Sequence, residues 1–163
     1  MTDAVDQLLA AWKEARPDLD PSPLGIVGRV IVLAQHLEKS VATALAEHGI
    51  TLGQFDILAT LRRSGPKGGL TPTQLLGSVM LSSGGMTSRL DTLERSDWIV
   101  RHPDPNDRRG VIIELTPKGR KLIDAATATR FDEASKSRPD LNAAERTKFE
   151  GMLRMWLARF APG

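Results

Sequence analysis

The stretch 71-TPTQLLGSVMLSSGGMTSRLDTLERSDWIVRHPDPNDRRGVIIELTPKGRKL-122 contains most of the signals that decide the fold. Thr71-Pro72 puts a capping hydroxyl before a residue suited to the first helical position, which predicts a short helix over 72–79. Apolar residues then recur at Met86, Leu90 and Leu93. This is the spacing of one helix face, and it predicts a second helix from about Ser83 to Ser96.

A β-hairpin is predicted directly after this second helix. The runs Trp98–His102 and 111-VIIEL-115 have the composition of strands. The segment 103-PDPNDRRG-110 between them is rich in turn-forming residues and is expected to be the connecting turn.

A third helix is predicted upstream, over about 52–63, because Thr51 and Gln54 have the spacing of a capping box. Three helices followed by a hairpin form the order of a winged helix-turn-helix, which we expect over about 51–115. The fold class is therefore expected to be α+β, mostly α.

The flanking segments, over about 22–48 and 117–160, are expected to be helices with more apolar surface than one small domain buries. The first is apolar along two faces and the last along a wide stripe. We interpret both as surfaces that meet a second copy of the chain in a homodimer; the alternative is packing within one chain. The residues concerned are Leu24, Ile26, Val27, Val30, Ile31, Leu33, Ala34, Leu37, Val41, Ala44 and Leu45, and Phe149, Met152, Leu153, Trp156, Leu157 and Phe160.

Composition excludes several classes of protein. The chain has 163 residues, of which 40% are hydrophobic and 26% are charged, as expected for a globular domain. Its lack of cysteine rules out disulfides and thiol chemistry and fits a cytoplasmic location. We expect no signal peptide, no membrane-spanning segment and no membrane partner. The net charge of +2 does not by itself indicate a nucleic-acid partner.

The sequence also lacks the signatures of an enzyme. It contains no combination of nucleophile, base and orienting group, and no phosphate-loop or dinucleotide fingerprint. His36, His48 and His102 lack the spacing of metal ligands. We therefore expect neither catalysis nor a cofactor nor a metal.

Two surfaces are candidates for contact with double-stranded DNA. Small polar residues in the first turns of the second helix would let it enter a major groove, and arginines at the hairpin would lie along phosphates or enter a minor groove. The aspartates Asp104 and Asp107 are interpreted as turn-formers that orient these arginines. The alternative for each surface is a solvated polar face. The candidate residues are Ser82, Ser83, Thr87, Ser88, Arg89, Arg95, Arg108 and Arg109.

These motifs together resemble the MarR family of transcriptional regulators over roughly residues 24–160. The resemblance rests on the S-x-x-x-T-x-R-x-x-x-L-E run that begins at Ser83, on the D-x-x-D-R-R segment that begins at Asp104, and on the L-T-P-K-G-R that follows. It implies a MarR-type domain over 21–163 that binds a pseudo-palindromic operator as a homodimer. One departure is Asp97-Trp98, where the family usually has Gly-Leu; the indole would fill the core or line a pocket.

The N-terminal segment 1–20 adds a further helix with a tryptophan, which is similar to the urate-responsive branch of the family. That resemblance implies an anion site at Trp12, Asp56, Arg89 and Arg101. The effector would be a urate-like, carboxylate or phenolic anion that stacks on the indole and binds the arginines. Each residue has another possible role: Trp12 as an anchor of the extra helix, Asp56 as a helix-start carboxylate, Arg89 as a phosphate contact, and Arg101 as a partner of Asp104.

The expected function is that of a ligand-responsive transcriptional regulator, with repression relieved by the effector as the usual outcome for such proteins. The alternative is a winged-helix module for protein–protein contacts that lacks sequence-specific DNA binding. The two differ in salt dependence, because phosphate contacts release counterions.

Overall fold

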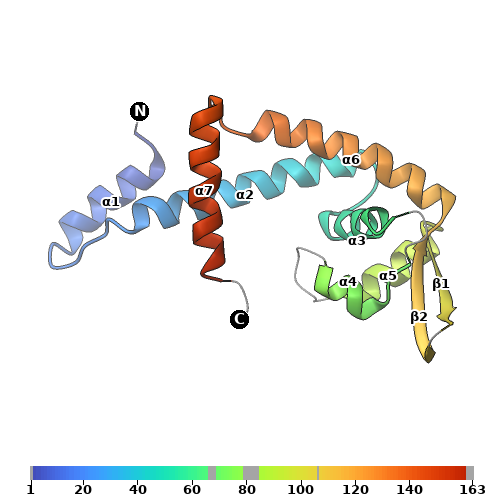
Figure 1. Ribbon diagram of the computed structural model, residues 1–163. Coiled ribbons are helices and arrows are strands. Elements are labelled where there is room, and N and C mark those ends of the chain that lie inside the picture. Colours follow the sequence, from blue (N-terminus) through green and yellow to red (C-terminus); the bar gives the residue numbers. More distant parts are fainter. Residues whose placement is uncertain (1, 66–68, 79–84, 106, 161–163) are drawn as a thin grey trace.

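The computed structural model describes residues 2–65, 69–78, 85–105 and 107–160, with the backbone alone for Arg108 and Arg109. Figure 1 shows α2 running through the molecule, with α1 at one end and α3, α4, α5 and the hairpin at the other. The elements are α1 (Ala4–Ala15), α2 (Leu24–Ala46), α3 (Leu52–Arg63), α4 (Pro72–Ser78), α5 (Met86–Arg95), β1 (Ile99–Asp104), β2 (Asp107–Leu115), α6 (Pro117–Ser137) and α7 (Ala143–Ala158). This confirms the expected α+β, mostly α, winged helix-turn-helix order.

The predicted helix caps are confirmed. The side chain of Gln54 accepts a hydrogen bond from the backbone of Thr51 at 2.8 Å, and Thr51 Oγ1 accepts one from the backbone of Gln54 at 3.3 Å. The same reciprocal pair joins Thr71 to Gln74 at the start of α4. Each cap satisfies amide groups that a helix leaves without an intrahelical partner, so the sequence determines where these helices begin.

Helix α5 begins at Met86, with Gly85 as its N-cap. Gly85 has a φ of 79°, a left-handed conformation that glycine adopts without steric cost. The expected start at Ser83 falls outside the described residues.

The hairpin differs from the prediction. The expected turn over 103–110 is wrong, because β1 continues to Asp104 and β2 already begins at Asp107. Pro103 pairs with Val111, and an irregularity in register follows between Pro103 and Asp104. Pro103 is tolerated because β1 is an edge strand. A β-carbon on Gly110 would lie 2.9 Å from that of Asp104, so the glycine permits the close approach of the strands.

The hydrophobic core lies where α3, α4, α5 and the hairpin meet the adjoining parts of α2 and α6. Leu70 extends the sheet on its other edge, where its backbone exchanges hydrogen bonds of 3.0 and 2.9 Å with Ile113. Trp98 packs against the core as expected, and Asp97 adopts a φ of 58° beside it. The largest fully buried side chains are Leu45, Ile57, Leu58, Leu75, Leu93, Ile99, Ile113 and Ile123.

The other end of the molecule leaves its apolar residues uncovered. Only Val41 and Leu45 of α2 are buried, and none of the residues of α7 is. Met155 and Leu157 are 69% and 71% exposed. None of the helices in the described ranges is both long and apolar enough to cross a bilayer.

Candidate nucleic-acid interface and ligand pocket

Helix α5 presents a polar face to solvent because its apolar residues are spaced to one side. Met86, Leu90 and Leu93 are buried. The exposed side chains include Thr87 and Ser88 near the start of the helix and Arg95 at its end. Hydroxyls and guanidinium groups in this arrangement suit contacts with base edges and phosphates. Of the other candidates on this segment, Ser82 and Ser83 lie outside the described residues.

Arg89 is turned toward α3. A β-carbon on Gly53 would lie 2.9 Å from Nε of Arg89 and 3.1 Å from its Cζ. The guanidinium therefore lies against the first turn of α3, where only glycine leaves room for it. Gly53 precedes the buried Asp56 by about one helical turn. Arg89 thus links α5 to the part of α3 that carries Asp56.

The base of the hairpin is fixed to the end of α5 and the start of α6. Thr116 Oγ1 donates a hydrogen bond of 2.7 Å to the carbonyl of Asp97, and Lys118 Nζ donates one of 2.8 Å to the carbonyl of Ser96. A β-carbon on Gly119 would lie 2.7 Å from the carbonyl carbon of Trp98 and closer still to its oxygen. Because α6 begins in contact with this backbone, the hairpin has a defined orientation relative to α5.

Arg108 and Arg109 belong to strand β2 and not to the turn that the sequence suggested. They lie between Asp107 and Val111, whose partners Asp104 and Pro103 are consecutive residues of β1, so both arginines fall within the irregular part of the strand register. Their contact with DNA stays a prediction.

Arg101 joins β1 to α5. Its Nη2 lies 2.7 Å from Oδ1 of Asp91, and its Nη1 lies 3.0 Å from Oε2 of Glu94. The two carboxylates are three residues apart and therefore on one side of the helix. Arg101 pairs with α5, whereas the sequence had suggested Asp104 as the alternative partner.

A pocket of about 520 Å³ lies between α3 and α6. Asp56 contributes to its lining and is 8% exposed. Arg63 and Arg130 supply positive charge, and Phe55 and Phe131 supply apolar surface. Mostly apolar walls with a few charged groups are typical of small-molecule sites.

Trp12 does not line this pocket. It borders a separate depression of about 380 Å³ formed by the end of α1 and the segment before α2, together with Leu19 and Pro21. Figure 1 shows α1 and the region of α3 and α5 at opposite ends of α2. Within one chain, the side chain of Arg89 lies against the first turn of α3, about one turn before Asp56. Trp12 lies far from both residues.

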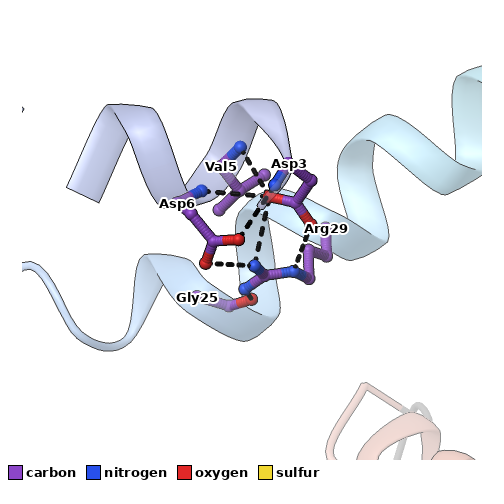
Figure 2. Close-up of polar contacts among 5 residues, drawn as sticks. All are labelled: Asp3, Val5, Asp6, Gly25 and Arg29. Atoms are coloured by element: carbon purple, nitrogen blue, oxygen red, sulfur yellow. Dashed lines mark hydrogen bonds and ion pairs between the residues drawn. The ribbon is translucent and has the colours of Figure 1, made fainter. Parts of the chain in front are cut away.

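The attachment of α1 to α2 rests on Arg29, as Figure 2 shows. Its guanidinium lies 2.8 Å from Asp3 and 2.6 Å from Asp6, and also donates to the carbonyl of Gly25. Asp3 and Asp6 form the capping box of α1. Hydrogen bonds from the backbone amides of this box, followed by those from Arg29, hold the pKa of both carboxyls below the usual value. The start of α1 is thus capped and anchored by the same charged groups.

Comparison with known proteins connects these features to one family. Residues 50–111, which span α3 to the middle of the hairpin, match the MarR family model. Over 149 residues the chain is 30% identical to the helix-turn-helix transcriptional regulator PecS of Dickeya dadantii, covering 91% of this chain and 90% of that protein. The chain belongs to the MarR family. Its relatives are transcriptional regulators, which confirms the expectation that it is not an enzyme.

Other MarR-family proteins support this assignment. The multiple antibiotic resistance protein MarR of Salmonella typhimurium is 34% identical over 99 residues, covering 60% of this chain and 67% of that protein. A mutant Escherichia coli MarR complexed with operator DNA aligns with a TM-score of 0.71 and 25% identity, covering 96% of this chain and 99% of that one. Sco3205 of Streptomyces coelicolor, in complex with DNA, has the same fold with a TM-score of 0.79 at 19% identity, covering 89% and 91% of the two chains.

In this MarR-family chain, the sequence alone did not indicate several residues that line the pocket around Asp56 or lie against Arg89. The pair Arg62-Arg63 ends the helix that carries Asp56 and was visible as a charge cluster. Arg130 and Phe131 come from the middle of α6, and no local pattern connects them to Asp56. Gly53 looked like an ordinary helix residue, and only the position of Arg89 shows why a side chain is excluded there.

Proposed function

We propose that this MarR-family protein is a ligand-responsive regulator that binds a pseudo-palindromic operator as a homodimer and is released from it by a small anionic or aromatic effector. The observation that carries the proposal is the defined orientation of the hairpin relative to α5. Helix α5 exposes Thr87, Ser88 and Arg95, and the hairpin bears Arg108 and Arg109. A helix and a wing held in one orientation suit a major groove and its flanking minor groove. Repression is the usual outcome for proteins of this kind.

The apolar residues left exposed on α2 and α7 support the homodimer. In α7, Phe149, Met152 and Leu153 are near 40% exposed or above, and no residue among Ala143–Ala158 is buried. Such a helix has little stability in water by itself. Exposed apolar patches of this kind mark interaction surfaces. A second copy related by two-fold symmetry would cover them and place two α5 helices at successive half-sites.

The pocket between α3 and α6 supports an anionic or aromatic effector. Arg63 donates a 2.9 Å hydrogen bond to Thr60, and Arg130 lies 2.6 Å from Glu133, so both guanidinium groups are held near the pocket. An anion bound beside them would repel the carboxylate of Asp56. The disturbance would pass through the first turn of α3 to Arg89 and shift the population of α5 positions away from DNA binding.

The four-residue anion site suggested by the resemblance is retained as a proposal. Arg89 lies against Gly53, about one helical turn before Asp56 on α3, whereas Arg101 is bound to two carboxylates of α5 that an anion would have to displace. Trp12 would reach an effector held at Asp56 only from the second copy of the chain. In its other role, as an anchor of α1, Trp12 would not contact the effector.

A winged-helix module for protein–protein contacts is the alternative. It does not require basic residues at the hairpin, and its binding would not fall steeply with salt. The family relationship favours DNA as the partner.

The experiment that tests the proposal is the selection of random and genomic DNA fragments on the purified protein, followed by sequencing. Recovery of an inverted repeat with half-sites about one helical turn apart is expected for a dimeric operator-binding protein. Failure to enrich any sequence at low salt would reject operator binding and favour the interaction module.

The ligand response is tested on the selected duplex with urate, salicylate and citrate as probes. Asp56→Asn and Trp12→Phe should preserve DNA binding and reduce the release caused by an active probe. The matched control is Asp140→Asn, an exposed acidic residue between α6 and α7. A normal response of both Asp56→Asn and Trp12→Phe would remove these residues from the effector site.

A further inference from the structure

Arg101 occupies a position between the hairpin and α5. It is the third residue of β1 and pairs across the hairpin with Ile113, which is fully buried. The side chain extends to α5 and ends between Asp91 and Glu94, with one Nη atom on each carboxylate. We propose that Arg101 is a positioning residue for DNA binding: it neutralises two carboxylates of the recognition helix and holds that helix to the hairpin.

The location of the carboxylates gives this ion pair its importance. Asp91 follows the exposed Ser88 by three residues and precedes Arg95 by four, so it lies along the polar face of α5. The side chains of Asp91 and Glu94 are 49% and 39% exposed. Carboxylates at a surface that meets phosphates repel them unless a cation lies close by. Arg101 is in contact with both.

The geometry distinguishes Arg101 from an arginine that contacts phosphate. Arg95 is exposed and makes hydrogen bonds of 3.3 and 3.2 Å within its own helix, to the carbonyl of Asp91 and to Thr92 Oγ1. Arg101 is only 29% exposed, and its two terminal nitrogens face carboxylates. The planar fork of a guanidinium presents donors in fixed directions to both carboxylates, whereas a lysine offers one compact charge on a flexible stem.

The ion pairs are expected to matter for binding much more than for folding. Pairs between partly exposed groups contribute little to stability, because water already screens them. Close to DNA the same carboxylates face a dense row of negative charges, and the loss of Arg101 would change the formal charge of the trio from −1 to −2. The inference rests on DNA contact by α5 and the hairpin, and it adds a residue that acts through that surface without touching DNA.

The test measures the affinity of five proteins for the duplex recovered by selection: wild type, Arg101→Gln, Arg101→Lys, Asp91→Asn/Glu94→Gln, and the triple variant that combines Arg101→Gln with both carboxylate changes. Arg101→Gln should weaken binding on the order of tenfold, because unit charges near phosphates are left uncompensated. The triple variant should bind within about threefold of wild type, since the repulsive charges are gone. Arg101→Lys should fall between wild type and Arg101→Gln.

Two controls separate positioning from other roles. Arg16→Gln removes a guanidinium that also makes two hydrogen bonds, of 2.8 and 2.6 Å, to a single carboxylate, Asp18, but at the far end of the molecule. It should leave affinity unchanged. Thermal unfolding of all variants at one protein concentration reports any loss of fold.

Three outcomes would overturn the proposal. An unchanged affinity of Arg101→Gln would show that the carboxylates do not matter. A triple variant as weak as Arg101→Gln would show that Arg101 contacts DNA itself. If Arg101→Gln fails to fold, the triple variant carries the test, and a tenfold loss in that folded protein would reject the proposal. A wild-type protein that binds no DNA contradicts the proposed function instead.

Discussion

Gly119→Ala tests whether the base of the hairpin is as tightly packed as the structure indicates. The added β-carbon would lie 2.7 Å from the carbonyl carbon of Trp98 and nearer to its oxygen, and this neighbour is backbone that cannot rotate away. The start of α6 would have to move by about 1 Å, and overpacking of this kind costs about 1–3 kcal/mol. The movement would also break the hydrogen bond of 3.1 Å from the amide of Thr116 to the carbonyl of Trp98.

The net effect on stability follows from three contributions. The lost hydrogen bond adds about 1 kcal/mol to the cost, and the better helix propensity of alanine returns about 1 kcal/mol. The free energy of unfolding should therefore fall by about 2 kcal/mol. Urea denaturation at a fixed protein concentration measures it, since a dimer's stability depends on concentration.

The matched control is Gly77→Ala in α4, where none of the described residues outside the helix's own turn lies within 4 Å of the added β-carbon. This variant should be as stable as wild type or slightly more so, because alanine is the better helix former. If Gly119→Ala behaves in the same way as Gly77→Ala, the close contact between α6 and Trp98 does not exist in solution.

Further predictions concern the wing, a buried carboxylate and α1. Arg109→Ala should weaken binding to all DNA sequences and lower the salt slope by about one unit; an unchanged slope in a salt titration would remove Arg109 from the interface. The hydroxyl of Ser137 lowers the pKa of Glu133 by hydrogen bonding. The stabilisation is therefore present above the usual value of 4.5 and lost as pH falls through the lowered folded-state pKa. Glu133→Gln should be less stable than wild type at pH 7, with the difference vanishing in acid; a difference independent of pH in urea titrations would refute this. Arg29→Gln should speed amide exchange in α1 roughly threefold to tenfold while α3 is unaffected, and equal exchange in both proteins would show that α1 is held by other contacts.

The sequence predicted best those features that depend on local signals. Thr51 with Gln54 and Thr71 with Gln74 determine where α3 and α4 begin, because a cap involves residues only three positions apart. The order of helices and hairpin followed from such signals and from apolar periodicity. The packing of Trp98 against the core agrees with one of its two expected roles.

Features that depend on contacts between distant segments were predicted less well. The turn was placed over 103–110 because Pro, Asp and Asn favour turns locally, but cross-strand pairing extends the strands into this segment. Asp104 was expected as the alternative partner of Arg101, whereas the carboxylates that it contacts lie on the preceding helix; its contact with an effector stays a prediction. The pocket around Asp56 needs Arg130, which becomes a neighbour only when α6 packs on α3.

The distance between Trp12 and Asp56 is another feature that local sequence signals do not determine. Its residue type agreed with an anion site, but a residue type carries no information on distance. Helix α1, which carries Trp12, and helix α3, which carries Asp56, lie at opposite ends of α2 within a chain, as Figure 1 shows. Any site that contains both therefore depends on how two chains assemble, a relation that the sequence of one chain does not contain.

The most direct test of the central claim is the affinity of the protein for the selected duplex and for a scrambled duplex, measured between about 50 and 200 mM salt. Binding through α5 and the hairpin predicts a clear preference for the selected duplex and a steep loss of affinity for both as salt rises. Equal affinity for the two duplexes, or affinity that does not respond to salt, would contradict the account.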